Sequence, residues 1–185
     1  MTELPVQRLL LEAVSILERL KVPYMIMGGF AVRVWAIPRP TYDADLAVAV
    51  DEDGMKAMLD ALEQGGFDVP DEHRKGFRDV VAGMQKVKAT RFESGTVWDV
   101  DLFVVRPGLL ESALRRRRSC PLADRVVWVM APEDVILMKL VAWRRKDQLD
   151  VEEIVKVTTD LDRIYLREWA IRLNVESRLR EFMAP

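Results

Sequence analysis

The sequence predicts an α+β (mixed α/β) fold, in which a mixed β-sheet is flanked by helices and followed by a helical C-terminal segment. The main observation is the order of its segments: helix, strand, helix, strand, helix, two strands, helix, strand, and then helices only. Glycine and proline residues separate most of these segments. A chain of 185 residues, half of them apolar, can bury a core of its own without disulfides.

The N-terminal elements are read from apolar spacing and helix-breaking residues. Thr2 is the expected cap of a helix with Pro5 in its first turn, and apolar residues recur at helical spacing as far as Lys21. A short apolar strand is expected at residues 24–27. The segment 30–37 is ambiguous by pattern, but its position after a strand and a glycine pair favours a helix.

A second strand and its following helix come next. Residues 43–50 form an apolar run after two acids, which is typical of a strand covered on both faces. Asp51 or Asp53 is expected to cap a helix that continues to Gln64, where two glycines stop it. The sequence assigns no clear element to residues 67–83.

The middle of the chain predicts a hairpin followed by alternating elements. Residues 86–105 read as two strands joined by a turn at Ser94-Gly95. A short helix with a basic end is expected at 107–118, a strand at 125–130, and a helix with acids in its first turn at 131–146.

Two or three further helices lead to the C-terminus. A boundary near Ala131 is expected to divide the chain into a core, 1–131, and a helical segment, 132–185, packed on it. The net charge of −2 argues against a polyanion-binding surface over the whole protein. Cys120 is the single cysteine, so an internal disulfide is excluded and a cytoplasmic location is expected. No apolar run reaches the roughly 20 residues that span a bilayer, so no membrane partner is expected.

Paired aspartates provide the first chemical signal. Asp43 and Asp45 stand two residues apart in a predicted strand, so their carboxylates point to one face. Like charges at this spacing repel, and a hard cation such as Mg²⁺ relieves them. An exposed strand edge protected by acids is the alternative for such a pair on its own.

A second aspartate pair lies on the next predicted hairpin. Asp99 and Asp101 also share one face, and strands that neighbour in sequence usually neighbour in space. A third acid beside Asp43 and Asp45 would complete a site for two Mg²⁺ ions, which can clamp both oxygens of a displacement at phosphorus.

A glycine pair is the candidate phosphate-binding segment. Gly28 and Gly29 lie between a predicted strand and a predicted helix, where backbone N–H groups and the helix dipole favour an anion. The missing side chains allow phosphate to approach the backbone closely. Without the aspartates, an ordinary turn would be the better interpretation.

Together these residues resemble the signature of the DNA polymerase β-like nucleotidyltransferase superfamily. Gly28-Gly29 followed by Asp43-Ala44-Asp45-Leu46, with a later acid, is most similar to the minimal bacterial nucleotidyltransferases related to the AbiEii toxins. Arg39 and Thr41 ahead of the acid pair, and the segment "LMKLVAWRRKDQLDVEEI", add to the resemblance. Ala44 departs from the bulkier aliphatic residue that is usual there.

The resemblance implies metal-dependent transfer of a nucleoside monophosphate from an NTP to an acceptor hydroxyl, with two Mg²⁺ ions. It implies that Asp43, Asp45 and Asp101 bind metal and carry catalysis, with Asp99 as the rival third acid. Nucleotide binding is assigned to Gly28, Gly29, Arg39, Thr41 and Lys139.

Plainer interpretations stand beside these roles. The alternative for Lys139 is an ordinary helical lysine, whose stem covers apolar surface while its charge is solvated. Arg144, Arg145 and Asp147 are expected to form a surface ion-pair group, and Arg39 could simply frame a proline turn. The run Arg115–Arg118 is expected to be a solvated helix end, with RNA phosphate binding as the alternative.

The partners expected are an NTP, an acceptor RNA, protein or small molecule, and a cognate antitoxin if the chain is the toxin of a toxin–antitoxin pair. The alternative function is a catalytically silent module of the same fold that binds a nucleotide or a partner protein.

Overall fold

The structure is a computed structural model of the chain, and it describes residues 5–75, 79–81, 83–93 and 95–183. Within these residues the elements are, in order, α1 (Pro5–Arg19), β1 (Tyr24–Ile26), α2 (Gly28–Trp35), β2 (Ala44–Val48), α3 (Glu52–Gln64), α4 (Asp71–Arg74), β3 (Asp79–Val81), β4 (Met84–Glu93), β5 (Thr96–Val104), α5 (Leu109–Arg116), β6 (Arg118–Leu122), β7 (Arg125–Val129), α6 (Pro132–Ala142), α7 (Arg145–Val157), α8 (Arg163–Arg172) and α9 (Glu176–Phe182). The predictions for Thr2 and Ser94 lie outside the described residues.

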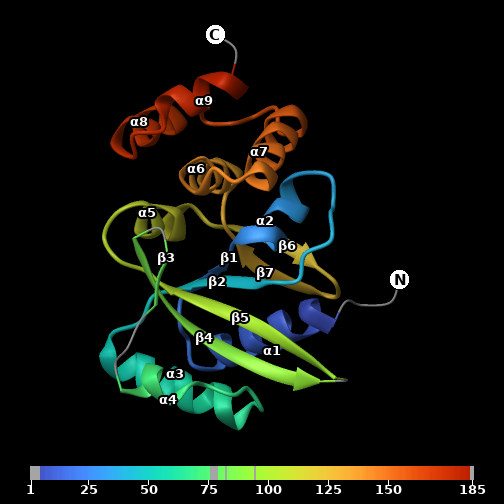
Figure 1. The fold of residues 1–185 in the computed structure, drawn as a ribbon, viewed down its shortest axis with the longest axis vertical. Coiled ribbons are helices and arrows are strands. Elements are labelled where there is room, and N and C mark those ends of the chain that lie inside the picture. The colour runs from blue at the N-terminus through green and yellow to red at the C-terminus, as the bar shows by residue number, and fades with distance from the viewer. Residues whose placement is uncertain (1–4, 76–78, 82, 94, 184–185) are drawn as a thin grey trace.

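A seven-stranded mixed sheet of order β3-β4-β5-β2-β1-β7-β6 forms the middle layer of the described chain (Figure 1). At its centre β2 runs parallel to β5 and antiparallel to β1, while β1 runs parallel to β7. Figure 1 shows α1 and α3 on one side of this sheet, and α2, α5 and α6 on the other. The predicted fold class is therefore confirmed, including the adjacency of the two aspartate-bearing strands.

The core lies between the sheet and these helices. α1 is amphipathic and buries Leu9, Leu10 and Leu17 completely. Because β2 lies in the middle of the sheet with helices over it, its apolar residues are buried on both faces. The side-chain carboxylate of Asp51, rather than that of Asp53, caps α3 by accepting from the Gly54 N–H at 2.8 Å.

Three described elements were not expected. α4 and β3 lie within the unassigned stretch 67–83, where neither apolar run is long enough to give a periodic signal. β6 begins at Arg118, the last of the four arginines expected to end a helix, and it contains Pro121. Because β6 is an edge strand, Pro121 is compatible with it, and β7 supplies its hydrogen-bonded partner.

The helix predicted over 131–146 divides into two. α6 ends at Ala142 because Trp143 takes a left-handed conformation at φ 53°, and α7 starts at Arg145. Asp147 then accepts from the Arg144 backbone N–H, which satisfies a group at the start of α7. The break places the end of α6 beside the first turn of α7.

The C-terminal helices α7, α8 and α9 form an outer layer above α6 and α2 (Figure 1). Trp143 stacks edge-on against Phe182 of α9, and the Arg178 guanidinium lies over the same indole while donating to the carbonyl of Leu140. The division of the chain at residue 131 stays a prediction.

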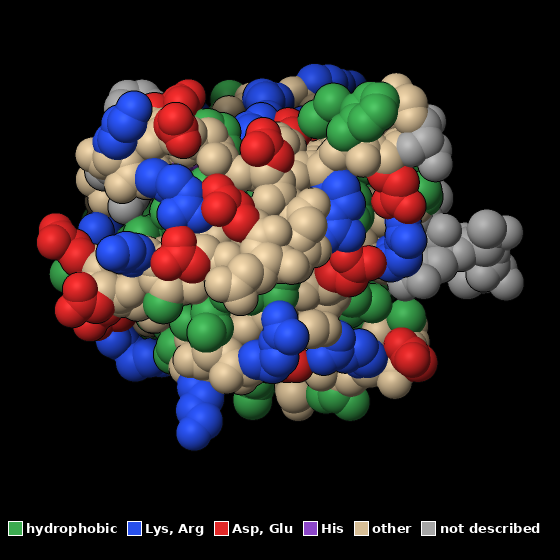
Figure 2. All heavy atoms as spheres, turned by 90° about the horizontal axis from the view of Figure 1, so that it is seen from below, with side chains coloured by type: hydrophobic (Ala, Val, Ile, Leu, Met, Phe, Trp, Pro, Cys, Tyr) green, Lys and Arg blue, Asp and Glu red, His purple; other side chains and the backbone are tan. Residues whose placement is uncertain are grey.

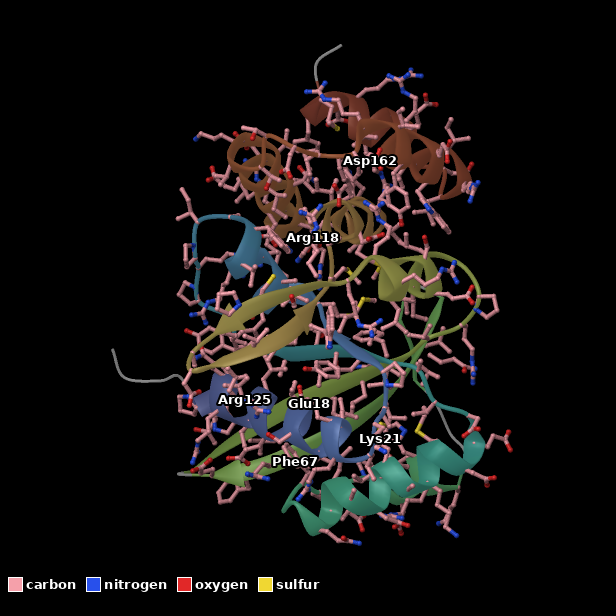
Figure 3. All side chains as sticks on the ribbon, turned by 180° about the vertical axis from the view of Figure 1, so that it is seen from behind. Glu18, Lys21, Phe67, Arg118, Arg125 and Asp162 are labelled. Atoms are coloured by element: carbon pink, nitrogen blue, oxygen red, sulfur yellow. The ribbon has the colours of Figure 1, made fainter. Side chains whose placement is uncertain are left out.

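The opposite end of the molecule carries charges of both signs. Figure 2 shows acidic and basic side chains interspersed on this face, which gives it no single-sign field. Behind the sheet, Arg125 of β7 binds Glu18 of α1 at 2.7 Å, and both side chains are labelled in Figure 3.

No helix in the described part of the chain has the length and apolar character needed to cross a membrane.

Candidate active site

The glycine pair packs directly against the residues that lead into β2. Gly28 has a left-handed φ of 61°, and a Cβ atom there would lie 1.9 Å from Oδ2 of Asp45. A Cβ on Gly29 would lie 2.3 Å from Oγ1 of Thr41. The backbone N–H of Met27 donates to the carbonyl of Asp45 at 2.9 Å, which holds the two segments together. The structure therefore brings Gly28, Gly29, Thr41 and Asp45 together at the start of α2.

Asp45 faces a second acid on the neighbouring strand. In the parallel pairing of β2 with β5, Asp45 is in register with Asp101. Desolvation by burial, followed by the charges of Asp101 and Asp43, raises the pKa of Asp45 to about 6, while Lys139 and Lys86 act in the opposite direction. Asp43 lies just before β2 and is exposed. The surroundings of Asp45 therefore disfavour its ionised form in the absence of a further cation.

The structure separates the two acids of β5. Asp101 is level with Asp45, whereas Asp99 lies beyond the segment that pairs with β2. Each acid meets a lysine of β4: Lys86 Nζ lies 2.6 Å from Asp101 Oδ2, and Lys88 Nζ lies 2.6 Å from Asp99 Oδ2. The second oxygen of Asp101, Oδ1, is buried and has no hydrogen-bond partner among the described residues.

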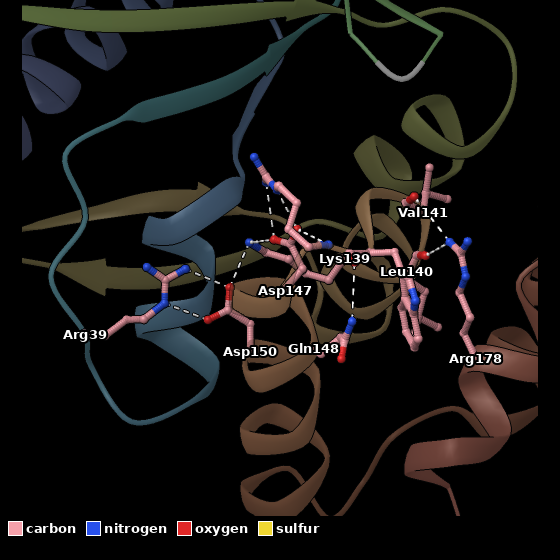
Figure 4. A network of polar contacts seen from close by, with 10 residues as sticks. Arg39, Lys139, Leu140, Val141, Asp147, Gln148, Asp150 and Arg178 are labelled. Atoms are coloured by element: carbon pink, nitrogen blue, oxygen red, sulfur yellow. Dashed lines mark hydrogen bonds and ion pairs between the residues drawn. The ribbon is translucent and has the colours of Figure 1, made fainter.

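An ion-pair network centred on three buried residues, Lys139, Asp147 and Asp150, borders the site on the helical side (Figure 4). Lys139 of α6 is buried, and its Nζ lies 2.9 Å from Asp147 Oδ1 and 2.8 Å from Asp150 Oδ2. Arg39 donates from two guanidinium nitrogens to the two oxygens of Asp150, at 2.6 and 2.7 Å. Arg144 donates to Asp147 at 2.7 Å. This network ties the loop ahead of β2 to α6 and α7.

The expectation that Arg144, Arg145 and Asp147 form a surface group is wrong for Asp147. Its carboxylate is fully buried, because the break at Trp143 turns the start of α7 inward toward Lys139. Burial opposes the ionisation of Asp147, but hydrogen bonds from Arg144 and Lys139 outweigh it and lower the pKa. Asp150 is held ionised in the same way, by Arg39 and Lys139. Lys139 is likewise a buried ion-pair residue rather than a solvated one.

A cavity of about 300 Å³ lies between the glycine–aspartate cluster and this network. Its polar wall consists of Gly28, Asp45, Lys139, Arg144 and Asp147. The rest of the lining is apolar, with several methionines and Phe103. A cavity with a charged wall and an apolar wall can accept a ligand that carries both phosphates and a flat apolar group.

A comparison with known protein families identifies the family of this chain. Residues 10–183 match the model of a family described as "Nucleotidyl transferase AbiEii toxin, Type IV TA system". The chain belongs to the AbiEii nucleotidyltransferase family. This confirms the resemblance predicted from the glycine and aspartate motifs. No curated protein matches the sequence well enough to be counted as a relative.

Solved structures share the fold of this AbiEii-family chain at low identity. A nucleotidyltransferase-like protein from Paracoccidioides brasiliensis is 18% identical, with a TM-score of 0.55 and coverage of 95% of this chain and 90% of that one. ANT(2")-Ia in complex with adenylyl-2"-tobramycin is 17% identical, with a TM-score of 0.56 and coverage of 94% and 98%. Lincomycin-bound LnuA, a lincosamide antibiotic adenylyltransferase, is 15% identical, with a TM-score of 0.56 and coverage of 85% and 100%. At these identities the likeness shows the fold.

The acids of the AbiEii-family chain only partly fit a metal centre. Carboxylate oxygens are suitable Mg²⁺ ligands, and the Asp45 carboxylate packs against the backbone of Gly28 at the start of α2. However, among the described residues no three His, Cys, Asp or Glu side chains come together as a metal-binding group. The metal roles of Asp43, Asp45 and Asp101 therefore stay predictions.

Sequence reasoning missed Lys86. It lies on β4, four positions before Thr90 in a hairpin where Lys88 is directly opposite Asp101. The signal was available: in the hairpin pairing "KVK" and "DVD" are offset by two residues, so each lysine meets the aspartate that lies diagonal to it. It could not be used without the register of the hairpin.

Proposed function

We propose that this chain transfers a nucleoside monophosphate from an NTP to an acceptor hydroxyl, in an Mg²⁺-dependent reaction. The observation that supports this most strongly is the cluster of Gly28, Asp45 and Asp101, in which one carboxylate packs on the glycine turn and another faces it from the next strand. Membership of the AbiEii nucleotidyltransferase family supports nucleotidyl transfer in general.

In the proposed reaction the acceptor oxygen forms a bond to the α-phosphorus, the bond from the α-phosphorus to the bridging oxygen breaks, and pyrophosphate leaves. The hydroxyl proton passes to Asp101. Gly28 and Gly29 hold phosphate oxygens through backbone N–H groups at the start of α2. Mg²⁺ held by Asp43 and Asp45 would neutralise charge on the transferred phosphate.

The remaining predicted binding residues act from the borders of the cavity. Thr41, packed on Gly29, and Lys139, in the cavity wall, are proposed to contact the triphosphate. Arg39 is proposed to act by fixing Asp150, and through it Lys139, because its guanidinium is already bound to that carboxylate.

The test is a labelling assay with the whole chain, Mg²⁺, cell lysate and each of the four α-labelled NTPs in turn. We expect one NTP to label one class of macromolecule or small molecule. D43N and D45N should abolish labelling while leaving the circular dichroism spectrum unchanged. Full activity in D43N would show the mechanism to be wrong.

The two acids of β5 supply a matched pair of variants for the same assay. D101N should lower the transfer rate by roughly 10²-fold or more, as expected for loss of a proton acceptor. D99N should stay close to wild type, because Asp99 lies beyond the pairing with β2. The reverse result would make Asp99 the third acid.

We further propose a toxin role, since the family description names a toxin of a type IV toxin–antitoxin system. Induced expression of the chain should arrest bacterial growth, and D45N should not. Equal growth arrest by the wild type and by D45N would show that the toxicity does not depend on nucleotidyl transfer. Co-expression of the neighbouring gene then tests for a cognate antitoxin.

The competing function is a silent nucleotide-binding or partner-binding module. Calorimetry that detects NTP binding, together with no labelled product from any lysate fraction, would favour it. The charged cavity wall of Asp45 and Lys139 could bind a nucleotide in an enzyme and in a silent module alike. The transfer assay is therefore the measurement that distinguishes the two functions.

A further inference from the structure

The acid of β5 that faces Asp45 already has a cation beside it. Lys86 Nζ and Asp101 Oδ2 are 2.6 Å apart, and the two side chains are only 13% and 18% exposed. An ion pair this shielded from water is little screened, so the ammonium neutralises most of the charge of Asp101. The same ammonium also acts electrostatically on Asp45.

Two other cations near the cluster, Lys139 and Arg144, are bound to other carboxylates. Lys139 Nζ lies between Asp147 and Asp150, and these two carboxylates are also bound by Arg144 and Arg39. Lys86 is therefore the cation that balances Asp101, while Asp43 and Asp45 make no ion pair with another described residue. Two carboxylates match the charge of one divalent ion.

The two oxygens of Asp101 have different surroundings. Oδ2 is held by Lys86, whereas Oδ1 is buried and, in the part of the chain that the structure describes, has no hydrogen-bond partner. A carboxylate anchored through one oxygen keeps a fixed orientation, which a positioned proton acceptor needs.

We propose that Lys86 is a built-in cation of this site: its ammonium neutralises and orients Asp101, so that Asp43 and Asp45 bind a single divalent ion and Asp101 is not a metal ligand. This proposal rests on the proposed function and replaces the expectation of two Mg²⁺ ions. Lys86 is a positioning residue, because it acts on the reaction through Asp101.

Mn²⁺ binding to the whole chain tests this without any transfer reaction. Electron paramagnetic resonance of free Mn²⁺ at pH 8 gives the number of ions bound and their affinity. The wild type should bind one ion, and D45N should lose it. K86M should bind Mn²⁺ roughly tenfold more tightly, because a positive charge near the ion has been removed.

K88M is the matched control, since Lys88 makes an ion pair of equal length with Asp99 two residues along the same strand. Its Mn²⁺ affinity should equal that of the wild type, as should that of K86R, which keeps the charge. An equal gain in K86M and K88M would mean a general charge effect and would overturn the proposal.

The double variant K86M/D101N removes the ion pair as a unit and avoids leaving a buried charge alone, so it keeps the test valid if K86M does not fold. Its Mn²⁺ affinity should stay within about threefold of the wild type. Loss of Mn²⁺ binding in the double variant would show that Asp101 is a metal ligand. Binding of two Mn²⁺ ions by the wild type would likewise contradict a single-ion site, and either result overturns the proposal.

The two proposals can fail separately. Mn²⁺ binding as expected, with no labelled product from any NTP, would remove the transfer function and leave the charge relation of Lys86 in place. Labelled product together with unchanged Mn²⁺ affinity in K86M would leave the function and remove the role of Lys86.

Discussion

At the scale of single residues, Gly28 shows why one atom decides whether the site can form. Its φ of 61° is a conformation that favours glycine, and a Cβ would be 1.9 Å from the carboxylate of Asp45. Both constraints fall on the same residue because the chain must turn into α2 while Asp45 packs against the turn. An alanine here would have to displace the acid or the backbone.

We therefore expect G28A to lower the free energy of unfolding by more than the roughly 1 kcal/mol that a left-handed alanine costs, and to abolish Mn²⁺ binding. Urea denaturation and Mn²⁺ titration measure the two effects. G95A is the matched control: Gly95 also has a positive φ, at 81°, but no described residue lies within 4 Å of its Cβ position. Equal effects of the two variants would show that the contact with Asp45 is unimportant.

At the scale of elements, the ion-pair network of Arg39, Lys139, Asp147 and Asp150 joins three segments that are distant in sequence (Figure 4). The loop ahead of β2, the end of α6 and the start of α7 meet at two buried carboxylates. Each of these carboxylates has two cationic partners, so removal of one acid leaves two cations short of a partner.

D150N should accordingly lower the free energy of unfolding by about 3 kcal/mol, because Arg39 and Lys139 lose a shared buried partner. Chemical denaturation measures the loss. E176Q removes an exposed ion pair of similar length, between Arg180 and Glu176 at 2.7 Å, and should cost less than about 1 kcal/mol. Equal losses would mean that the network is not the connection between these segments.

A second network, at the junction of α5, α6 and α8, gives a pH dependence. Asp134 is buried, accepts from the Tyr165 hydroxyl and lies 3.5 Å from Arg116. Burial raises the pKa of Asp134 from 3.8 to about 6, against these two partners. Between about pH 4 and pH 6 the folded state therefore binds more protons than the unfolded state, and the Asp134 contribution to stability falls as pH rises.

D134N should remove this contribution, which is on the order of 3 kcal/mol across the interval. Denaturation at pH 5 and at pH 7.5 should show the stability difference between the two proteins shifting in favour of D134N at the higher pH. Parallel stability curves for the two proteins would contradict the raised pKa. Taking the difference between them cancels the pH dependence of Asp45, which both share.

At the scale of the whole molecule, the C-terminal helices complete the core. α6 is buried almost throughout, between the sheet side of the molecule and α7 and α8, and it contributes Lys139 to the candidate site. A helix buried on all sides has no polar face to present to water. Separating the chain at residue 131 would therefore expose apolar surface on both parts.

We expect the full chain to unfold in a single cooperative transition and the fragment 1–131 to fail to fold. Differential scanning calorimetry of the full chain, with near-ultraviolet circular dichroism of the fragment, measures both. Two separated transitions, or a fragment with native near-ultraviolet signals, would support the division into a core and an independent segment. A single transition, together with an unfolded fragment, would show that residues 132–185 are part of the core.

How much of this protein could be predicted depended on how far apart the deciding residues lie in the chain. The glycine pair, the aspartate pairs and most elements were predicted from short stretches, because strand alternation, helix periodicity and backbone freedom act over a few residues. The left-handed Trp143, the edge strand β6 and the short α4 were missed because their conformations depend on neighbours outside the stretch itself.

The sequence by itself determined that this chain has the nucleotidyltransferase fold and which acids and glycines are candidates for its site. Only the tertiary structure decided which acid of β5 faces Asp45, which lysine binds it, and that Lys139 and Asp147 are buried. The physical reason is that the effect of a charge depends on its partners and on its distance from water, and both are fixed by strand register and helix packing.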